Sequence, residues 1–340
     1  MKRLSRKQRL RYWRRQQRII KQWHKERHVT PRPRKSELLA PEEFCLLNGS
    51  HHGVVDFFEK LRRACLKGGK VVIDFGKTKR FIADGTLLLY AEVDRLLDNV
   101  PNLKIRCRLP DNEKAAQVLQ QIGFLKRIGV HIDLSCGQES DVINWRTARG
   151  QGALGEKYDS ILGSYDGVIT EALQGELYTG LTESMTNAHH HAYLAPRGDG
   201  LLTSSEYKPW WMFSQEKEGM LTVVFCDLGI GIPGSLPVNE DEGWAKWWRV
   251  MSRRGYDRQG DAMVIRGAVR HSRTRTMLLN RGKGLRQIID TVSASKGGTA
   301  IIQSNKGWYR IAEGAETFGN HKQSIKGTVI FWRLPLPEAF

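Results

Sequence analysis

A six-residue run rich in apolar side chains, Leu221–Cys226 (LTVVFC), passes directly into an aspartate and two closely spaced glycines, Asp227, Gly229 and Gly231. The run has the length and β-branched composition of a buried strand. A carboxylate that ends such a strand lies at the edge of a sheet, and glycines allow the backbone beyond it to approach a ligand closely. The D-x-G-x-G-I segment therefore predicts a β-sheet with a ligand-binding loop at one edge.

Upstream, the segment LTESMTNAHHHAY carries Glu183, Asn187 and His191 at intervals of four residues, so a helix places them in one stripe. An acid, an amide and an imidazole are costly against a dry core, so we expect the stripe to face a wet pocket or a ligand. A solvated helix face is the alternative. Adjacent histidines point about 100° apart on a helix and do not ligate one ion together. A zinc site on His189 and a distant partner is the weaker alternative.

Two further glycine signals follow along the chain. Arg281–Leu285 (RGKGL) precedes a helical pattern at Arg286–Val292, and glycines that open a helix leave free N–H groups that suit phosphate. Gly327-Thr328 opens the last predicted strand. The GKT at Gly76–Thr78 is not a phosphate-binding P-loop, because that motif requires a glycine where the chain has Val71.

The order E-x-x-x-N-A … D-x-G-x-G-I … G-K-G-L … G-T resembles the GHKL ATPases, a family that includes gyrase, heat-shock chaperones, histidine kinases and anti-sigma kinases. The resemblance covers about residues 168–335, and its local form N-A-x-x-H-A-Y is similar to the histidine-kinase and anti-sigma-kinase branch. The resemblance implies the Bergerat fold, an α/β sandwich with a mixed sheet covered on one face by helices.

The resemblance also implies a role for each motif residue. Asn187 would hold Mg²⁺ through its amide oxygen, a hard ligand that suits this ion, and Glu183 would act as general base toward the attacking water or hydroxyl. Asp227 would accept a hydrogen bond from the adenine amino group, with Thr328 supporting the same edge. The other residues implied around ATP are Gly229, Gly231, Ile232, Gly282, Lys283, Gly284, Leu285 and His191.

The N-terminal half shows strand–helix alternation. Lys70–Gly76 reads as a buried strand, 83–99 as a helix, 103–109 as a half-buried strand, 112–129 as a helix and 131–134 as a short strand, so we expect a small α/β domain with parallel pairing. VVIDFGKTKRFIADGTLLLY, LKIRCRLP and VLQQIGFLKRIG, in this order, resemble a STAS-like domain. The family's phosphoacceptor serine is missing from the turn before the helix, where Thr86 is only a remote substitute.

The predicted fold class is therefore α/β, with a STAS-like domain followed by a Bergerat-fold domain. The predicted units are a basic N-terminal arm and linker at 1–36, the STAS-like domain at 40–135, a connector at 136–167 and the ATP-binding domain at 168–340 with a long lid at about 232–281. Within the lid, Trp244, Trp247, Trp248 and Met251 recur at helical spacing; core packing is the favoured interpretation, and a docking surface is the alternative.

The net charge of +18 is concentrated in two places. Residues 1–36 hold 15 Lys/Arg against Glu26 (15 − 1 = +14), and 246–286 hold 12 against Asp257 and Asp261 (12 − 2 = +10). We expect DNA or RNA contacts through the arm and the lid, although a solvated basic extension explains the arm equally well. A protein partner through the STAS-like domain and a homodimer are further alternatives.

The five cysteines are scattered and odd in number, and no run approaches the roughly 20 apolar residues that span a bilayer. The sequence therefore predicts a cytoplasmic protein with no membrane partner.

Three functions are compatible with these features. The first is a Mg-ATP-binding, ATP-hydrolysing switch that couples nucleotide state to a partner or nucleic acid. The second is a serine/threonine kinase of the anti-sigma type; a histidine kinase is disfavoured because none of the ten histidines precedes Asp or Glu. The third is an ATP-gated nucleic-acid binder, for which the chain ends too soon after Thr328 to supply the downstream catalytic lysine of such relatives.

Overall fold

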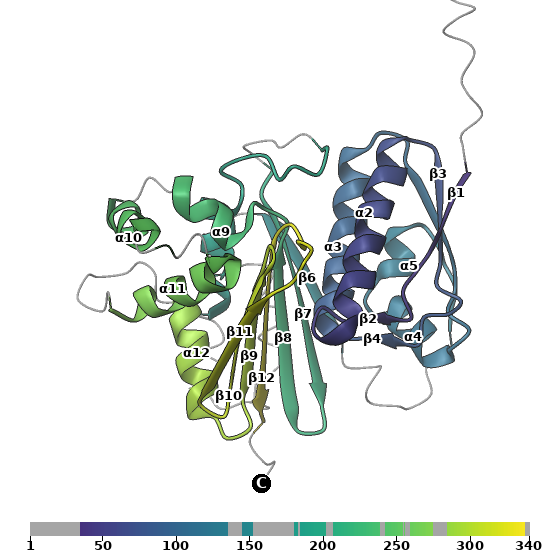
Figure 1. Cartoon of the computed structure of the whole chain (residues 1–340). Coiled ribbons are helices and arrows are strands. Elements are labelled where there is room, and N and C mark those ends of the chain that lie inside the picture. Colours follow the sequence, from purple (N-terminus) through teal and green to yellow (C-terminus); the bar gives the residue numbers. More distant parts are fainter. Residues whose placement is uncertain are drawn as a thin grey trace, which may run out of the picture.

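Two β-sheets lie on either side of a helical layer in the computed structural model, and more helices cover the far face of the larger sheet (Figure 1). The structure describes residues 35–134, 145–151, 180–182, 184–201, 207–238, 242–253, 255, 259–274 and 284–336. Within this part of the chain no helix has the length and apolar character needed to cross a membrane.

The smaller sheet is parallel, in the order β1-β3-β5, and confirms the parallel pairing predicted for the N-terminal half. A two-residue parallel pair, β2 with β4, lies beside it. Helices α2 and α3 connect its strands, and shorter helices α4 and α5 follow. The bounds are β1 Lys35–Leu39, β2 Glu43–Phe44, α2 His51–Leu66, β3 Lys70–Asp74, β4 Arg80–Phe81, α3 Ala83–Asn99, β5 Lys104–Arg108, α4 Glu113–Gln121 and α5 Phe124–Arg127.

Three local predictions in this half need correction. β1 begins at Lys35, so the predicted arm at 1–36 runs into the sheet; residues 1–34 lie outside the described part. The helix predicted over 112–129 is divided, because Gly123 has a φ of 76° and separates α4 from α5. Residues 131–134 form no strand.

The larger sheet has seven strands in the order β11-β10-β9-β12-β8-β7-β6. The bounds are β6 Trp145–Gln151, β7 Pro209–Lys217, β8 Met220–Asp227, β9 Thr299–Ser304, β10 Gly307–Ala312, β11 Ala315–Asn320 and β12 Thr328–Pro335. Leu221–Cys226 lies inside β8, as predicted, and is buried on both sides of the sheet, which explains its nearly continuous apolar composition.

The prediction of a mixed sheet is wrong for the described strands, because every pair in the larger sheet is antiparallel. The reason lies in the connections. Two-residue turns join β7 to β8 at Glu218-Gly219, β9 to β10 at Asn305-Lys306 and β10 to β11 at Glu313-Gly314, and such a turn can only link antiparallel neighbours. β6 was also missed: it lies within the predicted connector and pairs with β7.

Helices cover one face of the larger sheet on the side away from the N-terminal half (Figure 1). They are a helical segment at 180–182 and 184–192, α9 Gly231–Ser235, α10 Glu242–Arg253, α11 Asp261–Thr274 and α12 Gly284–Ala294. α10 confirms the amphipathic helix predicted in the lid. Its Trp248 and Met251 pack against Leu236, Val264 and Ala268, which supports the core-packing interpretation.

The opposite face of the larger sheet is covered by α3, so the sheet is not covered on one face only. One apolar core contains Leu88 and Val93 of α3 together with Phe213, Val224 and Val329 of the larger sheet. The two predicted domains therefore share a core, and α3 is buried around most of its circumference because a sheet lies on each side of it.

Candidate functional site

Asp227 is the last residue of β8, an interior strand of the larger sheet. We call the side of the sheet at which β8 ends the Asp227 edge. Asp227 is buried there, with 7% of its surface exposed. Its Oδ1 accepts a hydrogen bond from the Gly229 N–H at 3.0 Å, and the register places Thr328 opposite it on β12. Burial raises the pKa of Asp227 to about 6, although hydrogen bonds from Gly229 and Thr328 and the charge of Arg197 oppose the rise. The carboxyl group is thus mostly ionised at neutral pH and can accept a hydrogen bond.

Ser304 and Asn305 tie the loop after Asp227 to the neighbouring strands. The Ser304 hydroxyl accepts from the Ile232 N–H at 2.8 Å and lies 3.0 Å from the Thr328 hydroxyl. Asn305 Nδ2 donates to the Ile230 carbonyl at 2.8 Å. These two residues complete the cluster and were not predicted; the only signal was the turn sequence at Asn305-Lys306-Gly307, which marks a hairpin and says nothing of a site.

The two loop glycines are required by protein contacts. A Cβ on Gly229 would clash with the Ala192 carbonyl, and Ile230 N–H donates to that same carbonyl at 2.7 Å. Gly231 has a φ of 75°, and a Cβ there would lie 2.8 Å from the Asn305 amide. The prediction that these glycines admit a ligand therefore has a competing cause, since close packing against the helical segment and the β9–β10 turn already explains them.

Asn187 lies on the helical segment that the loop touches. It is half-buried, and within the described chain its amide makes no hydrogen bond. The residues directly after it, Ala188–Ala192, form a π-helical turn, a feature that often marks functional sites. Tyr193 anchors the end of this turn, because its hydroxyl accepts from the Leu228 N–H at 3.1 Å and donates to the Pro209 carbonyl. Glu183, the predicted base, lies outside the described residues.

The three histidines differ in exposure. His190 is exposed, whereas His189 and His191 are half-buried. Burial lowers the pKa of His189, with the charges of Lys208 and His190 adding to the effect, and its Nδ1 is buried without a hydrogen-bond partner among the described residues. Among the described residues no group of three His, Cys, Asp or Glu side chains is arranged to hold a metal ion, so the zinc alternative finds no support there.

α12 directs its N-terminus toward the same edge of the sheet. It runs from Gly284 to Ala294 and so includes the helix predicted at Arg286–Val292; a short connection then leads into β9, whose far end is Ser304. Because α12 and β9 run in opposite directions, the start of α12 lies toward the Asp227 edge (Figure 1). Its first turn contains no acidic residue. Leu285 is half-buried and packs on the apolar core beneath; Gly282 and Lys283 lie outside the described residues.

A buried ionic network lies behind the site. Arg197 donates to Glu92 of α3 and to the carbonyls of Ile325 and Lys326, which directly precede Gly327-Thr328. Arg95 of α3 pairs with Asp199 and lies 3.5 Å from the Leu228 carbonyl, which directly follows Asp227. The network thus holds both backbone segments that carry the candidate site.

Glu92 is the centre of this network and is 1% exposed. Burial alone would raise its pKa, but the charges of Arg197 and Arg62 outweigh burial and lower the pKa to about 2. Arg62 Nη1 donates to Glu92 at 2.7 Å. Glu92 of α3 thus connects Arg62 of α2 to Arg197, and Arg197 in turn holds the backbone at 325–326.

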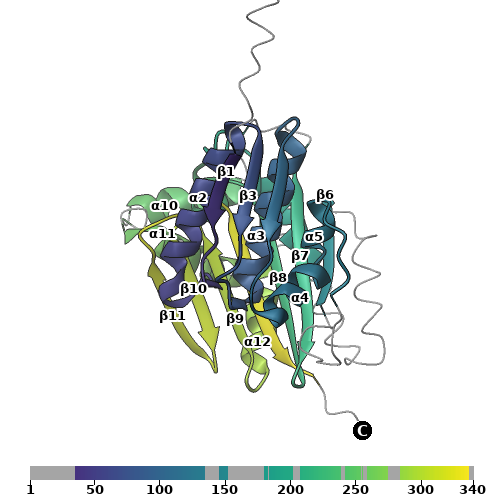
Figure 2. The same ribbon diagram turned by 90° about the vertical axis from the view of Figure 1, so that its right-hand side faces the viewer.

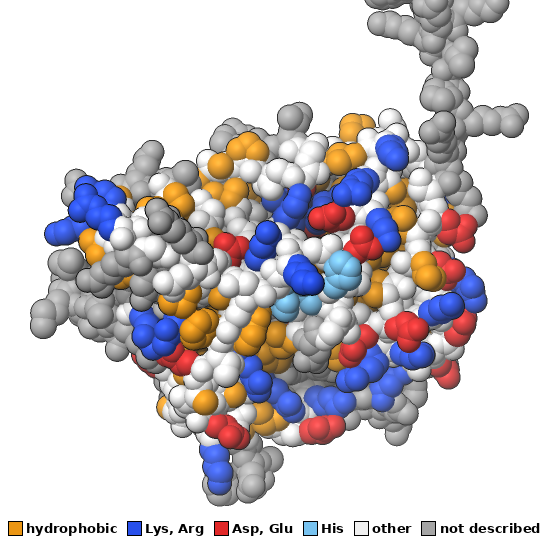
Figure 3. Space-filling model, viewed as in Figure 1, with side chains coloured by type: hydrophobic (Ala, Val, Ile, Leu, Met, Phe, Trp, Pro, Cys, Tyr) orange, Lys and Arg blue, Asp and Glu red, His pale blue; other side chains and the backbone are white. Residues whose placement is uncertain are grey.

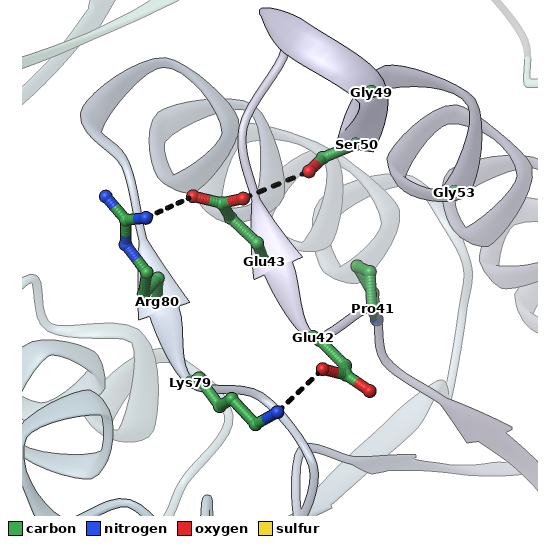
Figure 4. Close-up of a pocket in the computed structure, with 8 residues that line it drawn as sticks. All are labelled: Pro41, Glu42, Glu43, Gly49, Ser50, Gly53, Lys79 and Arg80. Carbon is green, nitrogen blue, oxygen red and sulfur yellow. Dashed lines mark hydrogen bonds and ion pairs between the residues drawn. The ribbon is translucent and has the colours of Figure 1, made fainter.

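A separate pocket of about 380 Å³ lies in the N-terminal half and contains none of the predicted site residues (Figure 4). Its charged side chains are already paired: Lys79 with Glu42 at 2.9 Å, and Arg80 with Glu43 at 3.3 Å. The Ser50 hydroxyl donates to Glu43 at 3.1 Å. Since its charges are satisfied by one another, this pocket does not present a strong binding site for an ion. The residues that line it are Pro41, Glu42, Glu43, Gly49, Ser50, Gly53, Lys79 and Arg80.

The lid arginines are partly neutralised within the protein. Arg266 and Arg270 of α11 both pair with Glu316 of β11, at 3.4 and 3.1 Å. Two of the basic residues predicted to contact nucleic acid therefore already have an acidic partner; Arg275 lies outside the described residues.

No protein-family model matches the chain, and no curated protein matches it at a significant level.

Proposed function

We propose that the protein is a Mg-ATP-binding and ATP-hydrolysing regulatory switch of the GHKL type. The observation that carries the proposal is the convergence of Asp227, Thr328, the helical segment bearing Asn187 and the N-terminus of α12 at one edge of the larger sheet. Asn187 and Thr328 are 141 positions apart in the sequence (328 − 187). Each element supplies the chemistry that a different part of ATP needs.

Asp227 is suited to read the adenine amino group. It is ionised at neutral pH, buried, and held in place by the Gly229 N–H, so its acceptor position is fixed before a ligand arrives. Thr328 and Ser304 form the polar wall beside it.

Asn187 and α12 are suited to the phosphates. The amide oxygen of Asn187 has no competing partner in the described chain and is a hard ligand of the kind Mg²⁺ prefers. The first N–H groups of a helix have no partner within the helix and favour negative charge, so the start of α12 is suited to a phosphate. Mg²⁺, when bound, neutralises charge on the phosphates, and in this proposal Glu183 orients the attacking water.

The ionic network supplies the coupling between the site and the N-terminal half. Arg95 contacts the backbone directly after Asp227, and Arg197 contacts the backbone shortly before Thr328. A nucleotide that shifts either backbone segment therefore also shifts α3. We infer that nucleotide state is read out through the N-terminal half.

A serine/threonine kinase that phosphorylates its own N-terminal turn is disfavoured. Thr86, the remote substitute for the phosphoacceptor, is fully buried and donates to the Ile82 carbonyl at 2.6 Å. A kinase acting on another protein stays the alternative.

Incubation of the full chain with γ-labelled Mg-ATP separates these functions. The switch predicts release of free phosphate, whereas the kinase predicts label on an added protein. Asn187→Ala is expected to abolish turnover because Mg²⁺ loses its protein ligand. Thr186→Ala, a half-buried neighbour on the same helix, serves as the matched control and should keep it. Turnover unchanged in Asn187→Ala, at an unchanged melting temperature, would refute the proposal.

A further inference from the structure

The outer face of the small parallel sheet is uncovered by any described helix. Alternate residues of a strand point to opposite faces, so one face carries the buried residues Val71, Ile73 and Ile105. α2 and α3 cover that inner face, and β1 and β3 lie at the outer edge of the molecule in Figure 1. In Figure 2, which turns this side toward the viewer, β1 and β3 lie in front. Parallel sheets usually have both faces covered, so an open face calls for an explanation.

The open face is basic. Register places Lys35, Lys70 and Lys104 in one row across the three strands, and Arg106 and Arg108 follow on β5. Among the outer positions whose side chains the structure describes, four are basic and two are acidic, Lys70, Lys104, Arg106 and Arg108 against Glu37 and Asp74, and Arg108 also pairs with Asp111 at 3.1 Å.

Three of these cations are available to a partner. Lys104 and Arg106 are exposed and Lys70 is half-exposed, and within the described chain none of the three is paired with a carboxylate. Asp74 is already engaged, since it accepts from the Gly76 N–H at 2.8 Å and lies 3.6 Å from Arg108. By contrast, basic and acidic side chains are interspersed over the face that Figure 3 shows.

The spacing of the cations fits a phosphate backbone. Alternate residues on a parallel strand are about 6.6 Å apart, so Lys104, Arg106 and Arg108 form a line of charges at that interval. Each strand of a DNA duplex carries one phosphate charge for about every 3.4 Å of helix axis, so its backbone presents a regular row of negative charges that a line of cations can contact. None of the nine outer positions is aromatic, and recognition of single strands relies on aromatic stacking. The chemistry therefore favours a duplex.

The segment of the sequence before β1 is also positively charged. Residues 1–34 carry 14 Lys/Arg and one acid, a net +13, and residue 34 directly precedes the first strand of the open face. Apolar residues at the outer positions are limited to Leu39 and Val72, too little for insertion into a membrane.

We propose that the outer face of β1-β3-β5 binds the phosphate backbone of double-stranded nucleic acid without sequence preference. This site lies on the small sheet and shares no residue with the candidate nucleotide site on the larger sheet. The inference does not rest on the proposed function, and duplex binding is measured in the absence of ATP.

Fluorescence anisotropy of the full chain with labelled mixed-sequence DNA and RNA duplexes, over a range of salt concentrations, tests the proposal. The variant Lys70→Gln/Lys104→Gln/Arg106→Gln removes three cations from the open face. Lys296→Gln/Lys306→Gln/Arg310→Gln is the matched control, because it removes two lysines and one arginine, all exposed, from the larger sheet and its connections.

The open-face variant is expected to weaken duplex binding by roughly tenfold or more and to reduce the log–log salt slope by about 2.7, or 0.9 for each phosphate that is no longer neutralised. The control variant is expected to leave both nearly unchanged. Equal effects of the two variants, or no effect of either, would overturn the proposal. So would tighter binding of poly-glutamate or of phosphatidylserine vesicles than of either duplex, because the face would then serve an acidic protein or a membrane.

Discussion

The two faces of the seven-stranded sheet are covered by helices in different ways. On one face, α3 brings buried charges: Asp94 accepts from the Trp211 indole N–H at 2.7 Å and from Arg149 at 3.0 Å, and Glu92 and Arg95 join the ionic network around Arg197. On the other face, apolar side chains make the contact, and Ile289 of α12 and Met185 belong to one apolar core with Phe225 and Trp332 of the sheet.

The two kinds of contact differ in how strictly they fix the position of a helix on the sheet. Apolar contacts are non-directional and allow helices to adjust, whereas a buried ion pair demands one geometry. The charged face therefore fixes α3 against the backbone of the candidate site, and the apolar face provides the helices that carry Asn187 and the start of α12. We expect the two faces to respond differently to mutation.

The largest effect is expected from Arg197→Leu. This change leaves Glu92 and Asp199 buried with fewer cationic partners, and breaking a buried pair from one side typically costs about 3–5 kcal/mol of unfolding free energy. Urea denaturation measures the loss. Arg63→Leu is the control, because its pair with Glu59 on α2 is exposed and worth less than about 1 kcal/mol. Equal losses in the two variants would show that the network is not what fixes α3.

The next effect concerns pH and the site. Burial raises the folded-state pKa of Asp227 from 3.8 to about 6, so this group favours folding below pH 3.8 and loses that contribution as the pH rises through 6. Nucleotide binding shows the opposite trend, because only the ionised carboxylate accepts the adenine amino group. Affinity for ATP is expected to fall about tenfold between pH 7 and pH 5, measured by isothermal titration calorimetry. Affinity that is independent of pH over this interval would separate Asp227 from adenine recognition.

The smallest effect is expected on the apolar face. Ile289 is fully buried, and Ile289→Val removes one methylene, which typically costs about 0.5–1.5 kcal/mol. The midpoint of urea unfolding should shift with no change in slope. A loss as large as that of Arg197→Leu would contradict the contrast between the two faces.

Local patterns predicted much of the scaffold. The strands at 70–74, 104–108 and 221–227 and the helix at 83–99 lie where periodicity placed them, and α12 includes the helix predicted at Arg286–Val292. Short-range sequence patterns are enough to predict these strands and helices, because the formation of each one depends mainly on residues close to it in the sequence.

The shared core could not be predicted, because its signals are long-range. Glu92, Asp94 and Arg95 look like a solvated helix face in the sequence, and they are buried because partners such as Arg197 and Trp211 approach from about a hundred residues away. The role of Ser304 is hidden for the same reason, since its hydroxyl contacts Ile232 and Thr328 only after three strands have paired.

The binding of ATP and GTP to the full chain and to Asp227→Asn tests the central claim most directly. Guanine presents a carbonyl where adenine presents its amino group, so Asp227 should favour ATP by roughly tenfold or more. Asparagine can donate to that carbonyl, so Asp227→Asn should narrow the preference. Calorimetric titration in the presence of Mg²⁺ measures both. Equal affinities of the unmodified protein for the two nucleotides, or a preference that Asp227→Asn leaves unchanged, would contradict the account.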